Sequence, residues 1–352
     1  MRRARYDARM VRTRTLAAAL LVAFATAPAH AATPLGARDS ARVVVFRDAT
    51  LHWNPDSVAK YARRGQRAED HGRVLVTTVA VPRAQGPHRV WADVTVTPIA
   101  KSEREPMDRY DRAGNVRLAL PGRPDVELVR FMTAYGGRTD WSVDVSALAP
   151  LLGDRAAVKV FVDTWARPGW RVDVALRVAP DTTWDAPSWA APVCYTDAYR
   201  DTMAALEAWV DVPPGTRRTV LRYLATGHCS DGRDEDEFVS KPNVIAVDGR
   251  VVARVHPWRS DCRRFRDANP YCARWTDGSW SSDYSRSGWC PGDVVTPIEF
   301  DLTDALTPGR HRVTVRVEGV RPRGADGEFG FWRLSAAVIG WDHAPRLWRN
   351  PQ

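Results

Sequence analysis

Short runs in which apolar and polar residues alternate fill residues 42–178 and limit what this chain can fold into. Among them are RVLVTTVAV, WSVDVSAL and WRVDVALRV. A period of two with β-branched and aromatic residues, bounded by glycine, proline and aspartate, is typical of antiparallel strands. The segment PDTTWDAPSWAAP (180–192) lacks this period, and similar runs resume after it. We therefore expect an all-β protein with a break near its middle.

The break predicts two domains, at 40–180 and 193–346, joined by a linker at 181–192. Each domain suits a jelly-roll β-sandwich, and the two follow each other in tandem. Asp248-Gly249 lies between two apolar runs and predicts a two-residue hairpin turn. Helical periodicity is scarce: residues 199–209 are the candidate for one helix, and 145–153 for one or two helical turns.

The first 31 residues have the pattern of an export signal. An arginine-rich start precedes the apolar run LAAALLVAFATA, and AHA follows as a small-x-small cleavage site. The apolar run is too short for a stable membrane span. We expect the mature chain to begin near Ala32 and to be secreted or periplasmic, with an anchored N-terminal helix as the alternative.

The net charge of +9 overstates how basic the mature chain is. Six arginines and one aspartate in the predicted signal account for +5, which leaves about +4. No run of lysine and arginine with interleaved aromatic residues occurs, so nucleic acid is not an expected partner.

The cysteines fit an exported protein but do not form a metal-binding pattern. There are five, all in the second half: Cys194, Cys229, Cys262, Cys272 and Cys290. Export permits disulfides, but an odd number leaves at least one thiol unpaired within the chain. No C-x-x-C occurs and no cysteine–histidine set has ligand spacing, so a zinc site is not expected.

Three carboxylates are candidates for chemistry because of their context. Asp111, Asp163 and Glu237 each lie at the start or end of a predicted strand, beside an aromatic residue. If they meet, burial and mutual repulsion would separate their pKa values, so that one acts as acid and another as base. The alternative is that they are turn or salt-bridge residues, as strand-end acids usually are.

The fifteen tryptophans add a second indication. Several flank loops of the second half, namely Trp258, Trp275, Trp280 and Trp289. An exposed indole face stacks on the apolar face of a sugar ring, although tryptophan also fills protein cores.

Several of these segments together resemble a known family. They are, in order, DRAGNVRL, VRFMTAYGGRTDWSVDVSALAPLL, VKVFVDTWARPGWRVDVALRV, ATGHCSDGRDEDEF, NVIAVDG and SRSGWCPG. The chain resembles the peptide-N-glycosidase F family, bacterial secreted amidases, over roughly residues 90–345. The most specific parts are RSGWCPG and the block from VDTW to WRVDV.

The resemblance implies two eight-stranded jelly rolls packed side by side, with the site at their junction. It implies hydrolysis of the amide between the innermost N-acetylglucosamine and asparagine, which leaves aspartate and releases the whole glycan. The implied partners are N-glycosylated proteins or peptides. No metal and no cofactor are implied, and we expect a monomer.

The resemblance also assigns roles to residues. Asp111 matches the catalytic aspartate that activates water, Glu237 the catalytic glutamate at the sugar end, and Asp163 a third, supporting acid. It pairs Cys262 with Cys290, while the pairing of Cys194, Cys229 and Cys272 stays open. The residues that it implies for substrate binding are Arg112, Arg286, Trp165, His228, Tyr110 and Trp289.

The chain departs from the family pattern at two positions near these acids. Tyr110 stands where the family has tryptophan, and Asp163 stands where it has glutamate. Aspartate is one methylene shorter, so its reach changes by about 1 Å, which is enough to affect activity. The small cysteine loops expected before Asp111 and around Glu237 are absent.

Two other functions deserve comparison with an amidase. A non-catalytic double jelly roll that binds glycans or proteins would use the same tryptophans and would tolerate the loss of Asp111. A copper monooxygenase on a related architecture would need paired histidine and methionine ligands, and the eight histidines are scattered. We favour the amidase because three acids and two arginines match in order.

Overall fold

Strand β4 (His88–Pro98) shows how the alternating runs become strands. Its residues alternate between buried and half-buried positions. It pairs antiparallel with β11 (Trp170–Pro180) along its whole length, from His88 opposite Pro180 to Pro98 opposite Trp170. The computed structural model describes residues 35–36, 38–229, 235–325 and 327–343. The predicted export signal lies outside them.

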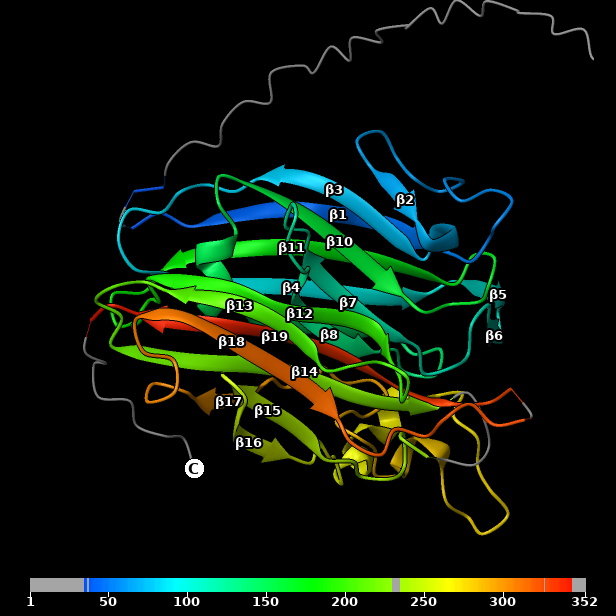
Figure 1. Ribbon diagram of the computed structural model, residues 1–352. Coiled ribbons are helices and arrows are strands. Elements are labelled where there is room, and N and C mark those ends of the chain that lie inside the picture. The colour runs from blue at the N-terminus through cyan, green and yellow to red at the C-terminus, as the bar shows by residue number, and fades with distance from the viewer. Residues whose placement is uncertain (1–34, 37, 230–234, 326, 344–352) are drawn as a thin grey trace, which may run out of the picture. The chain divides into compact units, whose positions relative to one another are not determined.

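The first sandwich combines a four-stranded sheet with a five-stranded one (Figure 1). Their strand orders are β1-β11-β4-β9 and β2-β3-β10-β7-β8. Apolar residues of both sheets share one core, which includes Phe46, Leu128 and Val160. The remaining strands are β1 (Ala41–Leu51), β2 (Arg67–Glu69), β3 (Val74–Ala80), β7 (Ala113–Leu118), β8 (Val126–Met132), β9 (Thr139–Asp144) and β10 (Arg155–Val162). A small hairpin of β5 (Ala100–Ser102) and β6 (Glu105–Pro106) precedes β7.

The second sandwich combines two four-stranded sheets, of order β12-β19-β14-β17 and β13-β18-β15-β16. Its core includes Tyr223, Ile245 and Val313. The strands are β12 (Trp189–Tyr199), β13 (Leu206–Val212), β14 (Arg218–Cys229), β15 (Asn243–Val247), β16 (Arg250–Val255), β17 (Ile298–Asp301), β18 (Gly309–Val317) and β19 (Gly330–Trp341). The expected fold of two tandem jelly-roll sandwiches is confirmed.

Strand β8 of the first sandwich contacts β12 and β19 of the second. All seven of its residues are buried because both of its faces are covered. Glu127 and Arg130 form an ion pair here, and the side chain of each is only 1% exposed. Arg130 also donates to the carbonyl of Arg333 at 2.7 Å, and Arg222 donates to the carbonyls of Glu127 and Leu128. The seam between the sandwiches is therefore held by charged side chains as well as apolar ones.

Two local predictions are confirmed and one is wrong. The Asp248-Gly249 turn joins β15 to β16 with positive φ at both residues, and a 3-10 helix, η2, occupies Ser146–Leu151. The predicted helix at 199–209 does not exist, because Tyr199 ends β12 and Leu206 begins β13. From Leu206 onward the burial pattern has a period of two, and pairing with β18 satisfies the backbone. Strand β12 begins at Trp189, inside the segment predicted as a linker.

A long irregular segment follows β16 and carries two short 3-10 helices, η3 (Cys262–Ala268) and η4 (Ser281–Asp283). In the described part of the chain, no helix has the length and apolar character needed to cross a membrane.

Candidate active site

Asp111 lies in the short loop that leads into β7, and the end of β8 fixes this loop. The backbone N–H of Arg112 donates to the hydroxyl of Thr133 at 2.7 Å, and this hydroxyl donates to the carbonyl of Tyr110 at 2.9 Å. The backbone N–H of Thr133 returns a bond to the carbonyl of Arg112. Thr133 thus holds the backbone on both sides of Asp111, while the ring of Tyr110 is 52% exposed.

Glu237 comes from the loop between β14 and β15, and its neighbour Asp236 anchors it. Asp236 is fully buried and has a left-handed backbone (φ 65°), which is uncommon for a residue with a side chain. Its carboxylate accepts hydrogen bonds from the indole of Trp332 at 2.7 Å and from the backbone N–H of Arg321 at 2.8 Å. The carbonyl of Glu237 accepts from the backbone N–H of Ser287. Residue 237 therefore has a fixed position next to a buried anchor.

Two glycines make room for this anchor. A Cβ atom on Gly227 of β14 would lie 1.9 Å from the carbonyl oxygen of Asp236, and one on Gly330 of β19 would lie 1.8 Å from its Oδ2. Only glycine permits the strands to approach Asp236 this closely.

Arg286 joins the two acids. Its Nε donates to Oε1 of Glu237 at 3.1 Å, and its Nη2 contacts Oδ2 of Asp111 at 3.5 Å. The guanidinium also donates to the carbonyls of Ser281 and Tyr284 and lies 4.7 Å from the ring centre of Trp289. Arg286 is buried, so its charge is compensated by these acids and not by water.

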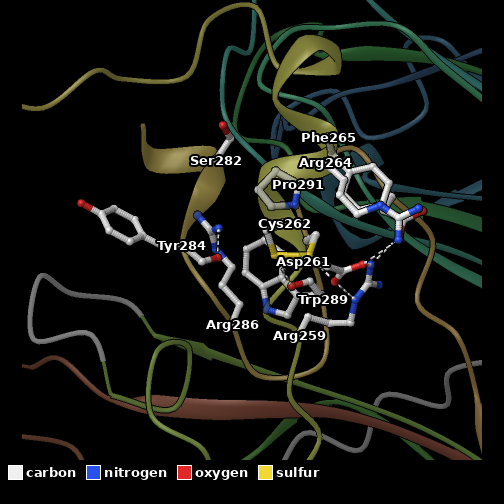
Figure 2. The surroundings of a disulfide bond; sticks show 12 residues. Arg259, Asp261, Cys262, Arg264, Phe265, Ser282, Tyr284, Arg286, Trp289 and Pro291 are labelled. Atoms are coloured by element: carbon white, nitrogen blue, oxygen red, sulfur yellow. Dashed lines mark hydrogen bonds and ion pairs between the residues drawn. A yellow bond between two sulfur atoms is a disulfide. The ribbon is translucent and has the colours of Figure 1, made fainter. Parts of the chain in front are cut away.

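The predicted disulfide between Cys262 and Cys290 is present and lies beside this arginine. Figure 2 shows it next to Trp289, with Arg286 and Tyr284 on the same segment. It closes the irregular segment that carries Arg286. Within the described residues, which include all five cysteines, Cys194, Cys229 and Cys272 form no disulfide.

Burial and charge shift the titration of both acids. Burial raises the pKa of Asp111, while Arg286 and a hydrogen bond from Tyr135 oppose the rise. Burial raises the pKa of Glu237 to about 7, with Asp111 adding to the rise and Arg286 and Cys229 opposing it. Burial alone would lower the pKa of Arg286, but the charges of Asp111 and Glu237 raise it by more. The guanidinium therefore stays charged. A pair of carboxyl groups around one arginine can hold one proton and provide an acid and a base together.

Arg112 is held by an acid that the sequence analysis did not single out. Its Nε donates to both carboxylate oxygens of Asp108, at 3.1 and 3.0 Å. The buried Asp108 also accepts from the hydroxyl of Thr164 at 2.6 Å. Among the described residues, no partner hydrogen-bonds to the Nη groups of Arg112, which leaves donors for a substrate oxygen.

Asp163 lies close to this loop, but arginines occupy both of its oxygens. Its backbone N–H donates to the carbonyl of Ala113 at 2.9 Å. Oδ1 accepts from Arg73 at 2.7 Å and Oδ2 from Arg333 at 2.6 Å, and Arg333 also pairs with Asp197. The geometry makes Asp163 the centre of an ion-pair network between the two sandwiches.

The network adjoins a pair of tryptophans, of which Trp165 is exposed and Trp53 is half-buried. The guanidinium of Arg73 lies 4.7 Å from the ring centre of Trp165, whose side chain is 53% exposed. Trp53 lies beside it, with ring centres 5.4 Å apart, and Arg167 lies over Trp53. Trp53 was not predicted, because it is a single aromatic residue in the part of the chain where the resemblance is weakest.

Besides Arg286, two more of the residues expected to bind substrate are buried, His228 and Trp289. The ring of His228 stacks between Trp289 and Phe331, and its Nε2 is 2.9 Å from the hydroxyl of Thr226. Burial lowers the pKa of His228 well below its usual value, so this histidine is neutral. Trp289 donates its indole N–H to the carbonyl of Gly227. Both side chains are buried, so neither has a free face for a ligand.

Tyr135 is a further site residue that the sequence analysis missed. Its hydroxyl interacts with Asp111, and its pKa is raised by burial and by the charge of Asp111. Its φ of 41° is left-handed, and a non-glycine residue in such a conformation is often found at functional sites. The only signal in the sequence is a tyrosine directly before two glycines. No cluster of three metal-ligating side chains occurs among the described residues.

Comparison with family sequence models decides the relationship. The model described as peptide-N-glycosidase F, N terminal, matches residues 121–178, and the C-terminal model matches residues 195–339. The chain belongs to the peptide-N-glycosidase F family. Asp163, Glu237 and Arg286 lie inside the matched residues of this family, whereas Asp111 and Arg112 precede them.

Solved structures of the peptide-N-glycosidase F fold are similar but distant. PNGF-II is 22% identical with a TM-score of 0.76, over 88% of this chain and 66% of that one. Recombinant PNGase F is 18% identical with a TM-score of 0.66, over 88% and 97%. PNGase F described as a glycosylasparaginase from Flavobacterium meningosepticum gives 18% and 0.66, over 87% and 97%. The chain thus spans about two thirds of the length of PNGF-II. No curated protein matches the sequence.

Proposed function

We propose that this protein is an exported amidase that cleaves the bond between N-acetylglucosamine and asparagine in N-glycoproteins or glycopeptides. The observation that carries the proposal is the Asp111–Arg286–Glu237 cluster, which takes one acid from each sandwich. A related structure is described as a peptide-N(4)-(N-acetyl-β-D-glucosaminyl) asparagine amidase. The cluster has the acid and base that hydrolysis of such an amide requires.

In the proposed reaction, ionised Asp111 accepts a proton from a water molecule that attacks the side-chain carbonyl carbon of asparagine. The carbonyl oxygen gains negative charge, and the Nη groups of Arg112 donate to it. Protonated Glu237 gives its proton to the departing nitrogen as the C–N bond breaks. The products are aspartate and a glycosylamine that carries the glycan.

Three aromatic rings suit the sugar end of this substrate, because aromatic faces pack against the C–H groups of sugars. The exposed Tyr110 directly precedes Asp111, and the exposed Trp165 contacts the half-buried Trp53 beside the network around Asp163. Arg73 and Arg167 lie against the two indoles and keep them in place.

The predicted signal at residues 1–31 supports export to the periplasm or beyond. Action as a monomer is part of the proposal, since each chain contributes both acids.

Incubation of the mature protein with a denatured N-glycoprotein and with a glycopeptide tests the proposal. Mass spectrometry should show the released glycan and conversion of asparagine to aspartate. Asp111→Asn should abolish turnover while leaving the circular dichroism spectrum unchanged. Retained turnover in this variant would remove Asp111 from the role of base.

A glycan-binding protein without catalysis is the second candidate, favoured by the exposed Trp165 and the contact that it makes with Trp53. It predicts that no substrate is cleaved at any pH, that a glycan array shows binding, and that Asp111→Asn leaves this binding intact.

A further inference from the structure

Both oxygens of the Glu237 carboxylate have a protein donor. Oε1 accepts from Nε of Arg286 at 3.1 Å, and Oε2 lies 3.5 Å from Sγ of Cys229. Cys229 is the last residue of β14 and pairs with Gly330 of β19, so its backbone belongs to the β12-β19-β14-β17 sheet. The thiol approaches the acid from a rigid element.

We propose that Cys229 is a positioning residue for Glu237, and that its thiol makes the site sensitive to thiol-directed reagents. The expected effect of Cys229 on turnover rests on the proposed function, whereas its expected effect on the titration of Glu237 does not. It assigns a role to a cysteine that the sequence analysis left open.

The geometry explains what the thiol adds. Arg286 alone fixes one carboxylate oxygen and leaves the group free to rotate about its last bond. A donor on the second oxygen removes this rotation and sets the direction in which the acid presents its proton. An S–H donor also stabilises the ionised form of Glu237, which is consistent with its opposing the rise in the pKa of that acid. Only the protonated thiol can donate in this way.

Access distinguishes this cysteine from the other two that form no disulfide. Cys229 is half-buried, whereas Cys194 and Cys272 are buried. Reaction of a cysteine requires that the reagent reach its sulfur. Any group added to Sγ of Cys229 would lie against Oε2 of Glu237, so the carboxylate would have to move away from its present position.

The first test measures the titration of Glu237 without turnover. Glutamate side chains are labelled with carbon-13 at the carboxyl carbon, and the signal of Glu237 is assigned with Glu237→Gln. In Cys229→Ala the midpoint should move to higher pH than in the wild type, and Cys229→Ser should return it toward the wild-type value because the hydroxyl donates. Cys272→Ala is the matched control and should leave the midpoint unchanged. An unchanged midpoint in Cys229→Ala would overturn the proposal, whether or not the protein is an active amidase.

The second test uses turnover of a glycopeptide. Loss of a hydrogen bond to a charged group predicts that Cys229→Ala lowers kcat/KM by about fivefold, with partial recovery in Cys229→Ser. Methyl methanethiosulfonate should inactivate the wild type: the thiolate attacks the reagent, a methyl disulfide forms on Cys229 and methanesulfinate leaves. Dithiothreitol should restore activity, and Cys229→Ser should resist the reagent.

One outcome of the reagent experiment would contradict the proposal. If mass spectrometry shows a methylthio group on Cys229 while turnover is unchanged, the thiol does not position Glu237. If Cys229→Ala does not fold, two other proteins decide the question: Cys229→Ser and the wild type that carries a methylthio group on Cys229. The readouts remain the titration midpoint of Glu237 and the turnover of the glycopeptide.

Discussion

The indole nitrogen of Trp332 donates a hydrogen bond to the buried carboxylate of Asp236 at 2.7 Å, and Asp236 directly precedes Glu237. Replacement of Asp236 by alanine would leave this indole and the backbone N–H of Arg321 without an acceptor in a buried place. We expect Asp236→Ala to lower the free energy of unfolding by about 2–4 kcal/mol. Urea denaturation measures it, and Asp201→Ala, on an exposed turn, is the control and should change stability by less than about 0.5 kcal/mol.

The pH dependence of kcat/KM should be bell-shaped. Asp111 must be ionised to act as base, and Glu237 must keep its proton to act as acid. Because the pKa of Glu237 is about 7, activity should fall as pH rises through this region, and protonation of Asp111 should limit activity at lower pH. Glu237→Gln should remove the basic limb together with most of the rate. A profile that stays flat from pH 6 to about 9 would exclude Glu237 as the general acid.

Glu237 should also make the wild type less stable as pH rises. Its pKa is near 4.5 when exposed and about 7 in the folded protein, so its contribution is most favourable below about 4.5 and is lost as pH rises through about 7. Glu237→Gln cannot ionise and should gain stability relative to the wild type over this window, by about 1–3 kcal/mol at pH 8. Thermal unfolding of both proteins at pH 4.5 and pH 8 measures this gain. If the stability advantage of Glu237→Gln over the wild type became smaller as pH rises, the raised pKa of Glu237 would be contradicted.

The tryptophan pair should contribute to substrate binding and not to chemistry. Trp53→Ala and Trp165→Ala should each raise KM about 5–30-fold on a glycopeptide, with a smaller change in kcat. Trp209 is a suitable control because it is 56% exposed on β13. Trp209→Ala should leave KM unchanged, and equal effects in all three variants would indicate a general loss of structure.

Asp163 should behave as an ion-pair residue. Asp163→Asn leaves Arg73 and the buried Arg333 with less compensating charge, so we expect a loss of about 1–3 kcal/mol in stability. If its effect on turnover follows from stability alone, addition of a stabilising osmolyte should restore much of the rate. Loss of turnover at full stability would instead support a direct catalytic role.

The sequence predicts the folds of both sandwiches well, because alternation with a period of two is a local property of each strand. Residues 199–209 were wrongly predicted as a helix because their alanines and leucine favour helix locally, whereas pairing with β18 is decided by residues a hundred positions away.

The resemblance indicated Asp111, Glu237 and Arg286, and the structure brings these three together. It could not indicate that His228 and Trp289 are buried or that Asp163 is held by two arginines, since burial and pairing depend on tertiary contacts. Asp108, Tyr135 and Trp53 carry no motif of their own.

The seam around Glu127 and Arg130 has a consequence for how the chain could be divided. A cut in the connection at 181–188 would leave Asp111 on one fragment and Glu237 with Arg286 on the other. The first fragment would expose the Glu127–Arg130 pair, while the hydroxyl of Thr226 and the carbonyl of Arg333, which both accept from Arg130, would lie on the second. Each fragment therefore covers the buried charges of the other. Co-expressed fragments would regain activity only if they reassembled along β8.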